Sequence, residues 1–121
     1  MLTTALPQLI YSITSLPPVY TNMQGTFNIP ENIKTIEPNA FEDSQLSTII
    51  IPDSVTFIGR MAFTGCSNLT DIYIPLSVKK IQEFAFSSCP KLTIHYAGED
   101  VPSTWSKKWN SGRRPVNFGE Y

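Results

Sequence analysis

A motif repeated three times at nearly constant spacing constrains the fold of this chain more than any other feature of its sequence. Each copy begins with an isoleucine-proline pair and closes with an alanine-phenylalanine pair. The copies run from Ile29-Pro30 to Ala40-Phe41, from Ile51-Pro52 to Ala62-Phe63, and from Ile74-Pro75 to Ala85-Phe86. Their starting isoleucines lie 22 and 23 residues apart. A fixed period of this size is typical of proteins built from stacked repeats, in which each unit packs only against its neighbours.

The end of each repeat has the apolar pattern of a half-buried strand. Apolar residues alternate with other residues in Leu46-x-x-Ile49-x-Ile51, in Leu69-x-x-Ile72-x-Ile74 and, if one residue is dropped, in Leu92-x-Ile94-x-Tyr96. Proline is found beside the isoleucine that begins each motif, and it ends a strand because it lacks an amide hydrogen. We therefore predict one short strand per repeat, with a second inward-pointing stretch at Val55-x-x-Ile58 and its equivalents.

Stacking these units predicts a mainly β solenoid with three full repeats in residues 29–96. Residues 1–28 are expected to form an N-terminal cap or docking segment and residues 97–121 a C-terminal cap, because three repeats are close to the minimum for stability. Trp105 and Trp109 are spaced for one face of a helical turn. We expect them to cover the open end of the last rung, where an uncovered edge would promote aggregation; the alternative is that they stack on a ligand.

The repeat resembles the BspA-type leucine-rich repeat of bacterial and protist surface proteins. The shared pattern is Ile-Pro-x-Ser-Val-x-x-Ile-x-x-x-Ala-Phe-x-x-Cys-x-x-Leu-x-x-Ile, and the tail Pro102-x-x-Trp105-x-x-x-Trp109-Asn110 is also similar to the family's usual ending. The second repeat matches nearly every position, including Gly59 and Cys66, whereas Glu37 and Gln82 stand at the position of Gly59 in the other two. The resemblance covers about residues 26–110. It implies a leucine-rich-repeat solenoid, a non-enzymatic role in protein binding or adhesion, and an extracellular or cell-surface location, although the first residues do not form a signal peptide.

Composition argues against several classes of function. Nine Lys and Arg residues against ten Asp and Glu give a net charge of -1, which does not favour nucleic acid as a partner. A single histidine and two cysteines do not make the common zinc sites, and the glycines form no phosphate-binding loop. No apolar run approaches the roughly 18 residues of a membrane span. We therefore expect no catalytic residue, no metal and no cofactor. The acidic pairs Glu42-Asp43 and Glu99-Asp100 are expected in solvated turns, with weak cation binding as the alternative.

The two cysteines, Cys66 and Cys89, occupy the same position of successive repeats. In a solenoid they stack about 4.8 Å apart, whereas a disulfide needs β-carbons at about 3.5–4.5 Å. We expect buried free thiols that pack as small apolar side chains, with a strained bridge or a redox role as the alternative.

Alternation predicts which strand side chains point away from the core. The outward row that we expect to contact a ligand is Asn28, Ile50, Tyr73 and His95, with Thr48 and Asp71 beside it. A mixture of apolar and aromatic side chains on one surface is typical of recognition sites, although it is also a common form of cross-strand packing. His95 is expected to be exposed, and with no nucleophile beside it we do not expect it to be catalytic.

The N-terminal segment has no charged side chain in its first 28 residues. Its apolar residues predicted to dock a partner are Leu9, Ile10, Tyr11, Ile13 and Leu16; simple closure of the core is the alternative. The C-terminal end is basic because of Lys107, Lys108, Arg113 and Arg114, which allows attraction to an acidic glycan or surface.

We therefore hypothesise a protein-binding or adhesion module. The alternative is a structural subunit or terminal receptor-binding domain of a larger assembly, such as a bacterial surface protein or a phage tail or baseplate, joined through residues 1–28, with a possible oligomer.

Overall fold

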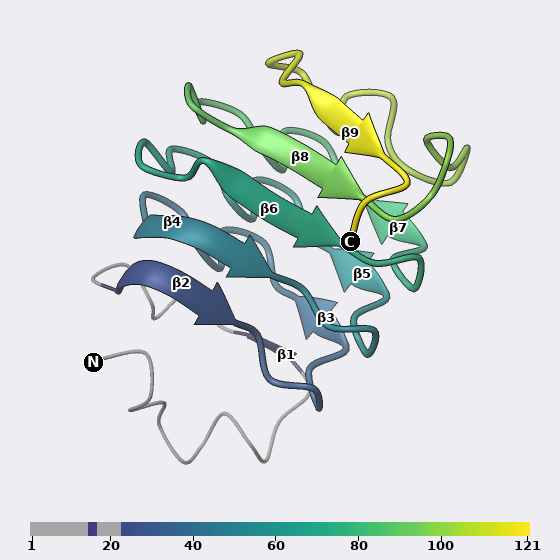
Figure 1. Ribbon diagram of the computed structural model, residues 1–121, viewed down its shortest axis with the longest axis horizontal. Helices are drawn as coiled ribbons and strands as arrows, with labels where there is room; N and C mark the ends of the chain where they lie inside the picture. The colour runs from purple at the N-terminus through teal and green to yellow at the C-terminus, as the bar shows by residue number, and fades with distance from the viewer. Residues whose placement is uncertain (1–14, 17–22) are drawn as a thin grey trace.

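The fold is a β-solenoid of about four turns, built from two parallel sheets that face each other (Figure 1). A computed structural model describes residues 15–16 and 23–121 of the chain. The described residues contain strands and turns but no helix. The predicted mainly β solenoid is confirmed, and the second sheet is an addition to the prediction of one strand per repeat.

The five-stranded sheet holds the longer strand of each turn. Its strands, in spatial order, are β2 (Gln24–Asn28), β4 (Gln45–Ile50), β6 (Asp71–Ile74), β8 (Thr93–Tyr96) and β9 (Val116–Phe118). The four-stranded sheet holds two-residue strands, β1 (Ser15–Leu16), β3 (Thr35–Ile36), β5 (Phe57–Ile58) and β7 (Lys80–Ile81). Strands β3, β5 and β7 arise from the second inward-pointing stretch of the three repeats.

Proline residues define where the chain leaves the five-stranded sheet. The carbonyl groups of Pro30, Pro52 and Pro75 accept hydrogen bonds from the amides three residues later at 3.1, 3.1 and 3.4 Å. Each proline therefore begins a turn that carries the chain toward the opposite sheet, as its fixed φ favours.

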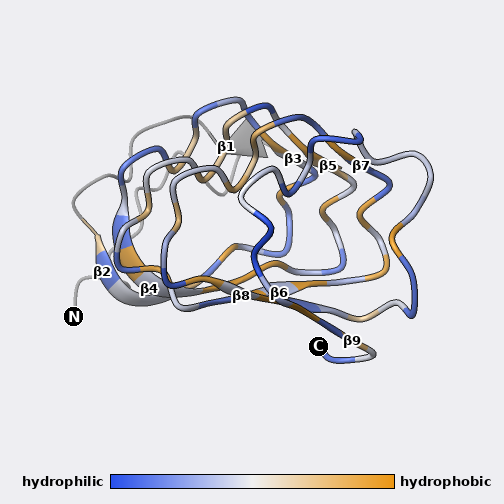
Figure 2. Cartoon of the chain, turned by 90° about the horizontal axis from the view of Figure 1, so that it is seen from above, coloured by the Kyte–Doolittle hydropathy of each residue, from blue (hydrophilic) through white to orange (hydrophobic). Residues whose placement is uncertain are grey.

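Inward side chains form columns between the two sheets, and Figure 2 shows hydrophobic segments recurring along the strands of both. Phe63 lies between Phe41 and Phe86, with centroid separations of 5.3 Å on both sides and interplanar angles of 5° and 3°. Phe27 extends this column at one end, and the Trp109 ring meets Phe86 edge-on at the other. All of these side chains are buried. The repeat period therefore becomes an aromatic stack through the core.

The two cysteines are free and buried, as predicted. The Cys66 thiol donates to the Phe41 carbonyl at 3.1 Å, and the Cys89 thiol donates to the Phe63 carbonyl at 3.0 Å. The contact with Cys89 and burial both raise the pKa of the Cys66 thiol. A raised pKa disfavours the reactive thiolate, so Cys66 is suited to packing rather than to redox chemistry.

The C-terminal residues cover the last rung in a way that differs from the prediction. Trp105 and Trp109 are buried, and their rings meet at a centroid separation of 4.8 Å. Successive turns, not a helical turn, hold them, so the predicted helical geometry is wrong. The Trp105 indole donates to the Val78 carbonyl at 3.2 Å, a partner one rung back that an isolated helical turn does not supply. Burial of both rings leaves no exposed face for a ligand to stack on.

Solvated turns hold the acidic pairs, as expected. Glu42 and Asp43 lie in a turn, where Glu42 accepts a hydrogen bond from the Asn39 amide group at 2.9 Å, and Glu99 and Asp100 are exposed in a bend.

The predicted docking residues Leu9, Ile10, Tyr11 and Ile13 lie outside the described residues. Leu16 contributes its backbone to β1, which pairs with β3. In the described part of the chain, no helix has the length and apolar character required to cross a membrane.

Candidate ligand-binding surface

The outer face of the five-stranded sheet brings the predicted ligand-contact residues together. Strand register aligns Asn28 with Ile50, Ile50 with Tyr73, and Tyr73 with His95. β9 then adds Asn117 beside His95. The predicted row therefore exists as one continuous line across the strands, which we call the central row.

A second line of side chains runs parallel to the central row. Register places Thr26 beside Thr48, Thr48 beside Asp71, and Asp71 beside Thr93. The Thr70 hydroxyl donates to Asp71 Oδ2 at 2.9 Å. Thr48 and Asp71 thus lie next to the central row, as the alternation predicted.

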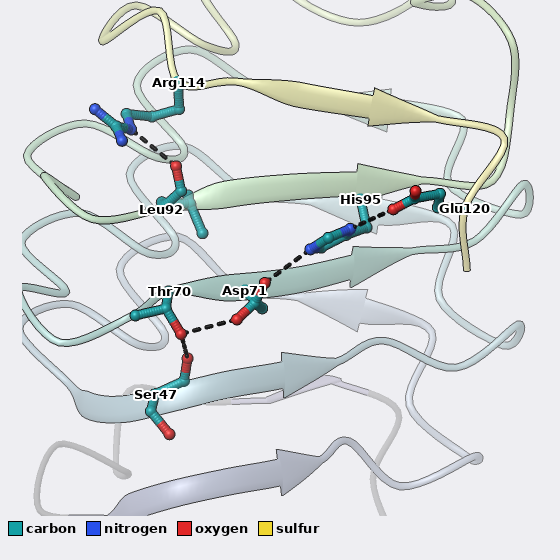
Figure 3. Close-up of polar contacts among 7 residues, drawn as sticks. All are labelled: Ser47, Thr70, Asp71, Leu92, His95, Arg114 and Glu120. Atoms are coloured by element: carbon teal, nitrogen blue, oxygen red, sulfur yellow. Dashed lines mark hydrogen bonds and ion pairs between the residues drawn. The ribbon is translucent and has the colours of Figure 1, made fainter.

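His95 is buried, and the prediction that it is exposed is wrong. Its exposed fraction is 9%, with Tyr73 against the face of the ring and carboxylates at both ring nitrogens. Nδ1 lies 2.7 Å from Glu120 Oε1, and Nε2 lies 2.8 Å from Asp71 Oδ1 (Figure 3). The ring also stacks on Tyr73 at a centroid separation of 4.4 Å and an interplanar angle of 11°. Strands β6 and β8 and the residues that follow β9 therefore converge on one imidazole.

The two carboxylates favour the protonated form of the imidazole. Burial acts to lower the pKa of His95, but the hydrogen bonds with Asp71 and Glu120 outweigh it and raise the pKa. The hydrogen bond with His95 in turn holds the pKa of Asp71 below its ordinary value. An imidazolium donates from both ring nitrogens, which matches an acceptor on each side.

This arrangement does not suit His95 to acid-base catalysis. A general base needs a ring nitrogen within hydrogen-bond reach of the proton that it removes. Carboxylates occupy both nitrogens, and the buried cysteine thiols donate to backbone carbonyls instead. Within the described ranges, no group of three His, Cys, Asp or Glu side chains is placed to hold a metal ion.

A pocket of about 680 Å³ opens beside the central row, at the ends of β2 and β4. Its lining combines outward strand residues with residues of the two following turns: Asn28, Ile29, Pro30, Glu31, Ile50, Pro52, Asp53, Ser54 and Tyr121. The Ser54 hydroxyl is buried without a hydrogen-bond partner. Tyr121, which is far away in sequence, reaches this pocket and donates its hydroxyl to the Ile51 carbonyl. Burial, Asp53 and Glu31 together raise the pKa of Tyr121.

Asn117, Glu120 and Tyr121 are residues of this surface that the repeat pattern does not reveal. They belong to no repeat, so no repeat register places them on the sheet. The only signal is Val116-x-Phe118, an alternating pair followed by Gly119, which is consistent with a short strand and a turn.

The repeat pattern and the two-sheet solenoid agree with a known family. A family described as a BspA type leucine-rich repeat region (6 copies) matches residues 19–105. The chain belongs to the BspA-type leucine-rich repeat family. No curated protein and no solved structure gives a significant match.

Membership of this family indicates a general class of function. BspA-type leucine-rich repeats are non-enzymatic modules that generally mediate protein interactions and typically occur on surface proteins. The family match ends at residue 105, so β9, Glu120 and Tyr121 lie beyond the matched repeats.

Proposed function

We propose that this BspA-type chain is a protein-binding or adhesion module of a cell-surface or secreted protein, and that it contacts its ligand through the outer face of the five-stranded sheet. The observation that carries the proposal is the register of the central row. Register sets polar, aliphatic and aromatic side chains side by side across successive strands, with a pocket at one end. Aromatic residues with a polar handle are enriched at protein interfaces.

The electrostatics of this face support a protein ligand. Asp71 and the threonines beside it offer directional polar groups, and Tyr73 and Ile50 offer apolar area. Interfaces combine such groups, with the binding energy concentrated in a few central residues. The described sheet face therefore has the composition of a recognition surface.

Photo-crosslinking tests the proposal directly. A benzophenone amino acid in place of Thr48 samples the proposed face, and the same amino acid in place of Lys80 on β7 samples the opposite sheet. We expect the Thr48 position, and not Lys80, to crosslink to partners on an array of secreted and cell-surface proteins. Equal crosslinking from both positions, or none from Thr48, would contradict the proposal.

Titration of a crosslinked partner measures the contribution of single residues. Ile50→Ala and Tyr73→Ala are expected to weaken binding by about tenfold each, the scale of an interface hot spot, while the melting temperature holds. Tyr73→Phe is the matched control, since it keeps the stack on His95. If the alanine variants unfold the chain instead, these side chains serve packing and not recognition.

A second candidate function is favoured by the N-terminal composition. The absence of charge in residues 1–28 suits a joint to another subunit, as in a bacterial surface protein or a phage tail or baseplate. Light scattering after size exclusion tests this candidate. A defined oligomer that Leu9→Asp and Tyr11→Asp dissociate would support it, and a monomer at every concentration would exclude self-assembly through this segment.

An acidic glycan is a further proposed partner, for the basic C-terminal end. Loss of heparin binding in Lys107→Glu would support this partner.

A further inference from the structure

The residues after β9 return across the sheet, and we call residues 119–121 the C-terminal tail. Gly119 has a φ of 75°, a conformation that glycine adopts readily, and the chain reverses there. The amide of Gly119 donates to the Gly98 carbonyl at 2.8 Å, and that of Glu120 donates to the Tyr96 carbonyl at 3.0 Å. In Figure 1 the tail runs from the tip of β9 past the end of β8 toward β6. The tail therefore crosses the strands instead of extending the sheet.

Two side chains attach the tail to the proposed ligand face. The Glu120 carboxylate binds His95, and the Tyr121 hydroxyl donates to the Ile51 carbonyl at the pocket (Figure 3 shows the first contact). Both remain largely in solvent, with an exposed fraction of 53% for the Glu120 side chain and 52% for Tyr121. Because about half of each side chain lies in solvent, the tail is held less firmly than the buried groups beneath it.

The groups beneath the tail are held much more firmly. His95 is fixed by Asp71 through one ring nitrogen and by the Tyr73 ring through its face. Its Nδ1 therefore points to where a carboxylate binds, whether or not Glu120 supplies that carboxylate. A less firmly held segment over a preorganised hydrogen-bond donor is the arrangement of an internal occupant that another segment can replace.

We propose that the tail is an internal substitute for the ligand, and that the ligand is a peptide segment in which an acidic residue directly precedes an aromatic residue. The acidic side chain would take the place of Glu120 on His95, and the aromatic side chain would take the place of Tyr121 in the pocket. This inference rests on the proposed function, since it names the chemistry of the partner for the same face.

The pocket adds a further condition on the ligand. The acidic side chains of Glu31 and Asp53 line it and give the pocket a negative field, in agreement with the raised pKa of the Tyr121 hydroxyl. A second acidic residue after the aromatic one would be repelled. The segment should therefore carry its negative charge before the ring, followed by a neutral or basic residue.

Peptide binding to the full-length chain tests the inference. The probe is the acetylated and amidated peptide Asn-Phe-Gly-Glu-Tyr, and its control is the same peptide with Gln for Glu. The receptor is the double variant Glu120→Gln/Tyr121→Ala, in which the tail no longer competes. We expect titration calorimetry to show that the double variant binds the Glu peptide at least about tenfold more tightly than the unaltered chain does. We also expect the Gln peptide to bind at least about tenfold more weakly, because a charge-assisted hydrogen bond is lost.

A third variant locates the site. Adding His95→Gln to the double variant should remove the preference for the Glu peptide. If this variant does not fold, as judged by circular dichroism, the comparison of the Glu and Gln peptides on the double variant still decides the question. Equal affinity for the two peptides, equal affinity of the two receptors, or no binding would each overturn the inference. A dimer that forms through exchanged tails would also overturn it, because the occupant would then be a second copy of the chain.

The two proposals fail separately. If position 48 crosslinks a surface protein but the Glu peptide does not bind, the binding function stands and the tail is only a cap. If position 48 crosslinks nothing and the peptide does not bind, both proposals fail.

Discussion

Truncation of Phe63 tests whether the aromatic stack is the main source of stability. The Phe63 side chain is fully buried, and its ring is stacked between Phe41 and Phe86 at 5.3 Å on both sides. Removing a buried phenylalanine side chain costs about 3–5 kcal/mol of unfolding free energy. We expect Phe63→Ala to fall in the upper part of this range. It removes two ring contacts, each worth about 0.5–1.5 kcal/mol, and rigid rungs on both sides limit collapse of the cavity.

Equilibrium unfolding in urea measures this cost, with circular dichroism as one probe and tryptophan fluorescence as the other. Trp109 contacts Phe86 edge-on, so its fluorescence reports on the end of the same column. Phe57→Ala is the matched control, because Phe57 is a half-buried side chain on β5 outside the core column. We expect the control to cost about 1 kcal/mol. If Phe63→Ala lowers the free energy of unfolding no more than Phe57→Ala does, the aromatic stack is not a main source of stability.

Three further predictions concern single positions. Because the pKa of His95 is raised in the folded chain, its contribution to stability is complete below its unfolded pKa of about 6.5 and is lost as the pH rises through the folded value. The unfolding free energy should therefore decline as the pH rises above about 6.5, and His95→Gln should flatten that decline; an unchanged slope would contradict this. Ser88 is exposed and has a φ of 57°, so Ser88→Gly should raise the unfolding free energy by up to about 1 kcal/mol, which urea unfolding will detect. In Gly59→Ala, the new Cβ would lie 2.6 Å from the Pro38 nitrogen, so we expect a loss of about 1–3 kcal/mol and a lower melting temperature; an unaltered melting temperature would show that the backbone yields without cost.

The repeat made the strands and the central row predictable. In a parallel solenoid, a residue at one position of a repeat pairs with the same position of the next repeat, so the sequence period is also the register. Ile72 therefore pairs with Ile94, and Tyr73 with His95, even though one residue is dropped near Leu92. The central row could be predicted from the alternation of inward and outward residues along each strand, because one face of each strand must be buried.

The environment of His95 could not be predicted by the same argument. Alternation correctly placed His95 on the side opposite Ile94. One of its two carboxylate partners is Glu120, 25 residues further along the chain and outside any repeat. Contacts of this kind carry no local periodicity, so neither spacing nor composition reveals them.

Backbone strain is another feature that the repeat pattern hid. Asn39, Met61 and Phe84 share one repeat position, and all three have a positive φ of 63°, 57° and 60°. Asparagine tolerates this conformation, but methionine and phenylalanine rarely adopt it. Their side-chain types therefore gave no sign of the turn. The fixed geometry of the stack imposes the turn on whichever residue occupies this position. At Met61, for example, the backbone amide donates a hydrogen bond to the Glu83 carbonyl of the next rung at 3.2 Å.

Closure of the solenoid and occupation of the ligand face are linked through one segment. The last repeat strand, β8, would present an unpaired edge, and β9 pairs with it in parallel. A parallel neighbour must run in the same direction as β8. The chain therefore leaves β9 on the side of the sheet where the strands have their carboxyl ends, which is also the side where the pocket lies. The reversal at Gly119 then directs the following residues across that end and onto His95 and the central row. The direction of the capping strand thus explains why the cap and the proposed competitor for the proposed ligand face are consecutive in the chain.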